Sequence, residues 1–172
     1  MNGVMTRRGA VQGLLMAALL PEITLAAAGT PPPLQLRRLA KDIFMHVSWV
    51  NYGGKGFVAS NGLVVLVQDG AVLIDTPCNA AYTTALLERI RMPVLQVIFT
   101  HAHDDRTGGH LVTLARGIPS LAYVKSSAKM EALGFGVPTA VWDGLSHDIT
   151  IGGRRFELFY PGGAHSFDNS VV

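Results

Sequence analysis

The chain has 172 residues, of which 49% are hydrophobic and 15% are charged, and its formal net charge at pH 7 is +2. This composition excludes an intrinsically disordered chain, and the length suits a single domain with its own hydrophobic core. The balanced charge gives no electrostatic basis for binding nucleic acid, so we expect no nucleic-acid partner. The single cysteine, Cys78, excludes an internal disulfide framework.

Residues 1–28 have the features of a cleaved export signal. Arg7 and Arg8 precede the apolar run VQGLLMAALL, and three alanines follow at residues 26–28. The sequence therefore predicts a periplasmic protein without a stable membrane anchor, since the run is too short to span a bilayer. The arginine pair leaves the twin-arginine export route open beside ordinary secretion. A cytosolic amphipathic helix is disfavoured, because LLMAALL has no polar face.

Residues 29–42, which include the stiff stretch TPPP, are expected to form a spacer that approaches the first strand, and residues 43–172 are expected to form the domain. Large apolar residues recur at every second position over residues 43–49, as in a strand. The segment FVASNGLVVLVQDGAVLID is predicted to form two strands that meet at Asp69-Gly70, a favoured hairpin dipeptide. Further strands are predicted at residues 94–99, 120–124 and 155–160, and residues 170–172 begin another.

Three helices are predicted between these strands. Asn79 can cap a helix that carries Leu86 on its apolar face and ends before Pro93. Shorter helices are expected over residues 110–117 and 126–134, each closed by a glycine. The alternation of strands and helices predicts an α/β fold, in which a sheet carries helices on an outer face. In such folds the loops at strand ends carry the chemistry.

The segment FTHAHDDRTGGH, residues 99–110, holds three of the six histidines and two aspartates. His101 and His103 are two residues apart, a spacing that points both imidazoles the same way in an extended loop. With Asp105 they form a mixed nitrogen and oxygen set that suits zinc. His165 also follows an apolar strand, and three histidines from two strand-end loops would leave a tetrahedral zinc with one open position. That is the arrangement of a catalytic site, and polar loop residues without a metal are the disfavoured alternative.

The loop THAHDDRTGG resembles the first zinc motif of the metallo-β-lactamase superfamily. DGAVLIDTP resembles the segment that precedes this motif in the family, and YPGGAHSFDNSVV resembles the segment that bears its next zinc histidine. The matches follow one another in the family's order over residues 43–172. Many hydrolases of the superfamily, such as glyoxalase II, carry a histidine where this chain has Arg106. The resemblance is therefore to the di-zinc, broad-spectrum subclass of class B metallo-β-lactamases.

The resemblance implies an αββα sandwich and a set of zinc ligands. His101, His103 and His165 would hold the first zinc, while Asp105 would bind the second zinc and orient the nucleophile. In the family the second site also needs a cysteine and a histidine from later strands, and these would lie beyond Val172. We therefore expect a C-terminally incomplete domain, with the second half of the sandwich largely missing. Two zinc ions are expected in the full-length enzyme, and at most one is expected to be tightly held here.

Two further groups of residues are assigned roles beside the metal ligands. Asp75 is expected to brace the metal loop by hydrogen bonds to backbone amides, with a turn-starting aspartate as the alternative. In the family the loop over residues 49–57 is a mobile flap over the substrate, so Trp49, Tyr52 and Phe57 would offer apolar area to that substrate. The glycines of this loop alone would equally support a plain hairpin turn.

Three residues near the motifs are expected to act on the protein rather than on a substrate. Asn169 is expected to brace the loop of His165. Asp168 is expected to accept hydrogen bonds from the backbone rather than to act as a base. Cys78 is expected to be a small apolar filler or a loop thiol rather than a metal ligand.

The resemblance implies zinc-dependent hydrolysis of the β-lactam amide bond by the full-length parent, and hence antibiotic resistance. The partner would be a small-molecule β-lactam, and we expect a monomer. We expect the chain as it stands to be inactive. The alternatives are another hydrolase of the same fold, acting on a thioester, lactone or phosphoester, and a non-functional truncated product. Arg106, which replaces a histidine, counts against the thioesterase-like members.

Overall fold

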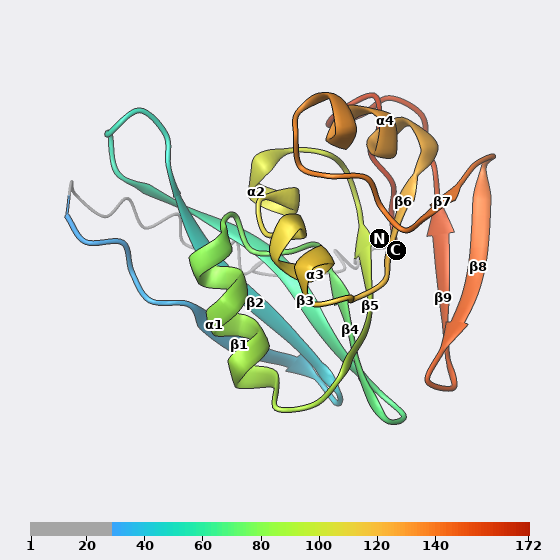
Figure 1. The fold of residues 1–172 in the computed structure, drawn as a ribbon, viewed down its shortest axis with the longest axis horizontal. Helices are drawn as coiled ribbons and strands as arrows, with labels where there is room; N and C mark the ends of the chain where they lie inside the picture. Colours follow the sequence, from blue (N-terminus) through green and yellow to red (C-terminus); the bar gives the residue numbers. More distant parts are fainter. Residues whose placement is uncertain (1–28) are drawn as a thin grey trace, which may run out of the picture.

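The computed structural model describes residues 29–172 (Figure 1). Residues 1–28, and with them the predicted export signal, lie outside the described part of the chain. Within that part, no helix is both long enough and apolar enough to cross a membrane. The strands are β1 (Gln35–Ala40), β2 (Ile43–Asn51), β3 (Phe57–Val67), β4 (Gly70–Ile74), β5 (Val94–Phe99), β6 (Ser120–Tyr123), β7 (Ala140–Trp142), β8 (Ser146–Ile151) and β9 (Arg154–Phe159). The helices are α1 (Ala80–Ile90), α2 (Asp104–Thr107), α3 (His110–Ala115) and α4 (Val124–Ala132).

Strands β1 to β7 form one sheet in which consecutive strands are neighbours, and β8 pairs with β9 in a separate sheet. The pairs from β1 to β4 are antiparallel, and those from β4 to β7 are parallel. The predicted hairpin at Asp69-Gly70 joins β3 to β4, with Asp69 at a positive φ of 64°. Helix α1 provides the crossover that the parallel pair β4–β5 requires. The carboxyl ends of β4 and β5 therefore meet at one edge of the sheet.

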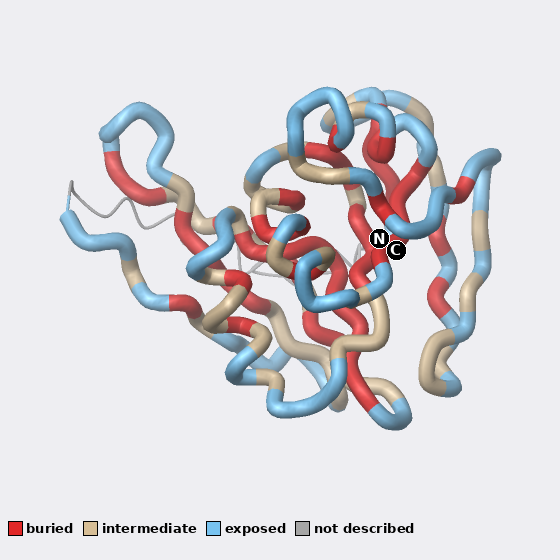
Figure 2. The backbone as a smooth tube through the Cα atoms, viewed as in Figure 1, coloured by how far each residue is buried: buried red, intermediate tan, exposed pale blue. Residues whose placement is uncertain are grey.

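Both faces of the seven-stranded sheet are covered, and the buried parts of the tube in Figure 2 follow its strands. Helices α1 and α3 lie over one face (Figure 1), where Leu86 of α1 and Met130 of α4 join the core. The opposite face packs against the two-stranded sheet through Phe156 and Leu158 of β9. All five residues of β4 are buried, which explains its unbroken apolar sequence GAVLI.

The predicted α/β fold class is confirmed, and the strands with apolar sequences occur where the sequence indicated. Residues 43–49 fall within β2, and residues 94–99 form β5. Asn79 caps α1 by accepting a hydrogen bond from the backbone N–H of Tyr82 at 2.9 Å. At the end of the chain, the expected strand is an isolated bridge between Val171 and Phe159.

Strands β1, β7 and β8 and the short helix α2 were not predicted. Strand β1 lies inside residues 29–42, the expected spacer, and five of its six residues are exposed. An exposed edge strand such as QLRRLA needs no apolar alternation, so its sequence carries little strand signal. Strand β8 likewise alternates only between exposed and half-buried positions. Helix α2 is a single turn within the metal loop itself.

Candidate metal centre

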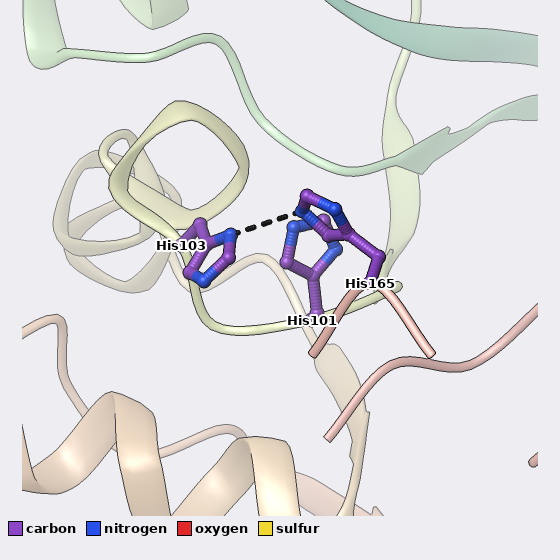
Figure 3. Close-up of side chains that lie close together, drawn as sticks. All are labelled: His101, His103 and His165. Atoms are coloured by element: carbon purple, nitrogen blue, oxygen red, sulfur yellow. Dashed lines mark hydrogen bonds between the residues drawn. The ribbon is translucent and has the colours of Figure 1, made fainter. Parts of the chain in front are cut away.

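The three predicted zinc histidines meet at the carboxyl-end edge of the sheet (Figure 3). His101 and His103 lie in the loop after β5, and His165 lies in the loop after β9. One ring nitrogen from each histidine falls within 4.8 Å of the others. Nε2 of His165 is 3.2 Å from Nδ1 of His103. The structure therefore brings together, from two loops, three side chains of the type that holds zinc.

His101 presents a free lone pair toward this cluster. Its Nδ1 is 3.0 Å from Oγ1 of Thr100, and the Thr100 hydroxyl donates to Oδ2 of Asp75 at 2.7 Å. The threonine oxygen is then free to accept from Nδ1–H of His101, which leaves Nε2 unprotonated. That Nε2 is buried and has no hydrogen-bond partner in the described structure. An orphaned lone pair beside two other imidazoles fits a metal ion.

Burial keeps His101 in the neutral form that binds metals. The imidazole is almost fully buried, and burial, aided by the charge of the neighbouring His103, lowers its pKa to about 4. Hence no proton competes for the lone pair near pH 7. The three imidazole donors and the neutral form of His101 both fit zinc.

Asp75 lies directly beneath the metal loop, at the end of β4. Its Oδ1 accepts a hydrogen bond from the backbone N–H of Thr100 at 2.8 Å, so the buried carboxylate holds the residue that precedes His101. Burial raises the pKa of Asp75 to about 7, although both hydrogen bonds from Thr100 act in the opposite direction. Asp75 also takes a positive φ of 61°. This position is the one expected of a bracing carboxylate.

The loop of His165 is held by Asn169. Oδ1 of Asn169 accepts from the backbone N–H groups of Ala164 at 3.2 Å and of Ser166 at 3.0 Å, the two neighbours of His165. The two metal-bearing loops are also joined directly, because the N–H of Ser170 donates to the carbonyl of Thr100 at 2.7 Å. Asn169 thus holds the His165 loop from both sides of the histidine.

Asp105 and Cys78 lie outside the three-histidine cluster of the described residues. The carboxylate of Asp105 is 3.4 Å from Nε of Arg106, and its backbone carbonyl accepts from Oγ of Ser60 at 2.6 Å. Cys78 is half-buried and its Sγ donates to the carbonyl of Trp49 at 3.4 Å. Burial raises the pKa of this thiol, which favours the protonated form over a thiolate ligand.

The expected flap is the β2–β3 hairpin, and here the structure corrects the sequence-based expectation. Trp49 and Phe57 are buried, at 8% and 6% exposure, in a small core with Val47. They support the base of the hairpin instead of offering apolar area to a substrate. Tyr52 alone of the three expected residues is exposed, at 52%. Nearby, Oδ1 of Asn51 accepts from the N–H of Gly54 and shapes the tip of the loop.

A cavity of about 530 Å³ opens beside the cluster, which is the size of a small-molecule site. Its lining residues include the polar side chains of His101, His165 and Arg106 and the apolar side chains of Leu63 and Val172. A second groove of about 580 Å³ separates the sheet from β9 and is mostly apolar. A small molecule bound in the first cavity would therefore meet the imidazoles directly.

Sequence reasoning missed Thr100, which joins Asp75 to His101. The only signal available was its position next to the first histidine. The hydroxyl matters because β4 and β5 are neighbours in the sheet, a pairing that the sequence alone does not specify.

Comparisons with known proteins give a consistent result. Residues 56–172 match the family model described as the metallo-beta-lactamase superfamily. The chain is 34% identical over 157 residues to a metallo-beta-lactamase type 2 from Pseudomonas aeruginosa, covering 86% of this chain and 60% of the relative. It is 28% identical over 167 residues to a metallo-beta-lactamase type 2 from Bacteroides fragilis, covering 92% of this chain and 66% of that relative.

Solved structures agree with this match. The DIM-1 metallo-beta-lactamase exposed to ceftazidime superimposes with a TM-score of 0.76 at 30% identity, covering 83% of this chain and 65% of that one. The mono-zinc form of FIM-1 from Pseudomonas aeruginosa gives a TM-score of 0.74 at 26% identity, with 84% and 66% covered. The chain thus spans between 60% and 66% of the length of these four proteins. By family model, relatives and fold, the chain belongs to the metallo-β-lactamase superfamily.

Proposed function

We propose that the protein hydrolyses the amide bond of β-lactam antibiotics with the help of zinc, and so confers resistance. The observation that carries this proposal is the cluster of His101, His103 and His165, with the unpartnered Nε2 of His101 facing the other two rings. The names of the relatives support the choice of substrate class. Because the chain spans about 60% of the length of the Pseudomonas relative, the activity is proposed for the whole protein.

Each residue has a distinct part in this proposal. His101, His103 and His165 would hold the first zinc, and a bound zinc supplies Lewis acidity that activates water and polarises a carbonyl. Asp105 would orient the attacking water, and Tyr52 would contact the substrate from the hairpin tip. The half-buried Asp105 lies in α2, which directly follows the loop of His101 and His103, and this position supports the assignment.

We further propose that the 172 residues hold one zinc tightly and need additional residues for rapid hydrolysis. Asp105 is a single carboxylate, and one oxygen ligand does not hold zinc by itself. A groove of about 580 Å³ beside β9 is lined by the half-buried Leu63 and by the buried Val65 and Ile74, and further residues could fill it.

The test uses the 172-residue chain and a chimera. The chimera joins residues 1–172 to the C-terminal part of the Pseudomonas aeruginosa relative that lies beyond the aligned region. Carbapenem hydrolysis by the purified chimera, abolished by EDTA and restored by zinc, would support the proposal. If the chimera hydrolyses no β-lactam but cleaves a thioester, lactone or phosphoester, the proposed substrate class would change from β-lactams to that compound class.

We also propose that the protein is exported to the periplasm and is a monomer. Arg7, Arg8 and the apolar run that follows them support export. N-terminal sequencing of periplasmic material should begin between Ala27 and Thr30, and an intact Met1 on such material would refute the cleavage. Light scattering of the purified protein tests the monomer.

A further inference from the structure

Asp168 connects the two loops that carry the metal histidines. It lies three residues after His165, and its side chain is 4% exposed. Its Oδ2 accepts a hydrogen bond from the backbone N–H of Ala102 at 2.8 Å. Ala102 is the residue between His101 and His103, and it is completely buried. A carboxylate from one metal-bearing loop therefore holds the centre of the other.

Helix α4 fixes this carboxylate in place from the far side. Nζ of Lys129 donates to Oδ1 of Asp168 at 3.1 Å. Oγ of Ser126 donates to the backbone carbonyl of Asp168 at 2.6 Å. Both oxygens of the carboxylate are thus engaged, one by the metal loop and one by the ammonium group. The Asp168 side chain is buried and that of Lys129 is 36% exposed, so a partly exposed ammonium group donates a charge-assisted hydrogen bond to a buried carboxylate.

We propose that Asp168 is a positioning residue that sets the separation between the His101–His103 loop and the His165 loop, with Lys129 orienting its carboxylate. This inference rests on the proposed three-histidine zinc site and is independent of the substrate. Asn169 acts within one loop, since it bonds Ala164 and Ser166. Asp168 acts between the loops, so its loss should change how the three nitrogens converge.

The side-chain chemistry predicts a specific pattern for substitutions. Asp168→Ala removes the acceptor of the Ala102 amide and should weaken zinc binding by about tenfold or more, as loss of a group that supports metal ligands does. In Asp168→Asn the amide has one oxygen for two donors, so its NH₂ must face either the Ala102 N–H or the Lys129 ammonium. Zinc binding should weaken here as well. Adding Lys129→Met to Asp168→Asn frees the amide oxygen for Ala102 and should recover most of the affinity.

The experiment measures zinc affinity by chelator competition and the visible spectrum of the cobalt-substituted site, in the 172-residue chain and in the chimera. Melting of the metal-free protein is recorded for each variant. Asp148→Asn is the matched control, because it breaks the exposed ion pair to Arg155 by the same chemical change. It should leave the zinc affinity and the cobalt spectrum unchanged.

Two results would overturn the inference. One is an Asp168→Ala variant that binds zinc within about twofold of the parent and keeps its cobalt spectrum. The other is a double variant, Asp168→Asn with Lys129→Met, that binds zinc no more tightly than Asp168→Asn alone. The loss of zinc affinity would then be due to general destabilisation. If the 172-residue chain folds poorly, the same zinc-affinity measurements on the chimera decide the test. These readouts do not involve hydrolysis, so an inactive chimera that binds zinc would contradict the proposed function without contradicting the role of Asp168.

Discussion

Oγ1 of Thr100 lies 3.0 Å from Nδ1 of His101 and 2.7 Å from the buried carboxylate of Asp75. The hydroxyl therefore links the carboxylate to the imidazole through two hydrogen bonds and orients the ring. It donates to Asp75 and accepts from Nδ1–H of His101. Nε2 of His101 is then unprotonated and can bind a metal ion. The selection of one tautomer depends on a residue that is not itself a ligand.

Thr100→Val should weaken zinc binding by about tenfold, because Nδ1 of His101 loses the acceptor that fixes its tautomer. Asp75 also loses one of two hydrogen bonds, so the free energy of unfolding should fall by about 1–3 kcal/mol. Chelator competition and urea unfolding measure the two effects. Thr113→Val is the control, since Thr113 is fully buried, more so than the half-buried Thr100, and its hydroxyl donates to the carbonyl of His110. Thr113→Val should lower the free energy of unfolding but leave zinc affinity unchanged. Equal loss of zinc affinity in the two variants would contradict the role of the Thr100 hydroxyl.

Zinc content should be at most about one ion per 172-residue chain, because three nitrogen ligands converge in the described structure. His103→Ala should abolish tight binding, since two histidines leave too few protein ligands. Cys78→Ala should change nothing, because its sulfur contacts the carbonyl of Trp49. Elemental analysis after exhaustive dialysis gives the number directly. A lower zinc content in Cys78→Ala would show that the thiol is a ligand after all.

The fold was predictable where burial imposes a pattern on the sequence. Strand β4 is buried throughout and its residues are continuously apolar, and Asn79 is both the expected and the observed cap of α1. Strand β1 was missed for the opposite reason. Its residues Arg37 and Arg38 are exposed at the sheet edge, where tertiary pairing with β2 makes a strand that local sequence does not specify.

The site was predictable to the extent that it is local. His101 and His103 share a loop, so their spacing alone indicated a metal. His165 lies 62 residues beyond His103 and was added from its position after an apolar strand, which the family resemblance then supported. The burial of Trp49 and Phe57 was not accessible from sequence, because aromatic residues at the ends of a loop can face either the core or the solvent. The role of Thr100 required knowing that β4 and β5 are adjacent.

Gly108→Ala should destabilise the protein by about 1–3 kcal/mol or more, the usual cost of overpacking. Gly108 has a φ of −59°, so alanine suits its backbone, but an added Cβ would collide with the carbonyls of Cys78 and Asp104. Backbone atoms cannot move aside as flexible side chains do. At Gly163 a Cβ comes closest to the ring of Phe167, which is 85% exposed, and meets the backbone only at ordinary contact distance, so Gly163→Ala should be tolerated. Urea unfolding of both variants tests the contrast, and equal midpoints would contradict it.

His46 should make the protein sensitive to acid. Burial lowers its pKa from 6.5 to about 4, so between these values the unfolded chain binds a proton that the folded chain does not. Stability must then fall as the pH drops from about 6.5 to 4. In His46→Gln the side chain keeps a donor for the carbonyl of Asp75 but does not titrate. Between pH 7 and pH 4.5 the free energy of unfolding of this variant should therefore fall by about 2–3 kcal/mol less than that of the parent. Parallel stability curves for parent and variant would rule out this contribution.

The 172-residue chain should confer no measurable resistance to β-lactams, whereas the chimera should hydrolyse carbapenems and lose that activity in EDTA. The three histidines provide one metal site. For the second metal site expected from the family, the 172 residues supply one ligand, Asp105. Beside β9, a groove of about 580 Å³ is lined by Leu63, Val65 and Ile74, and an unfilled groove leaves packing contacts unmade in a domain whose total stability is only about 5–15 kcal/mol. Minimum inhibitory concentrations and initial rates with purified protein measure the two outcomes. A 172-residue chain that hydrolyses a carbapenem at a rate near that of the chimera would mean that the three-histidine site suffices and that the groove needs no covering.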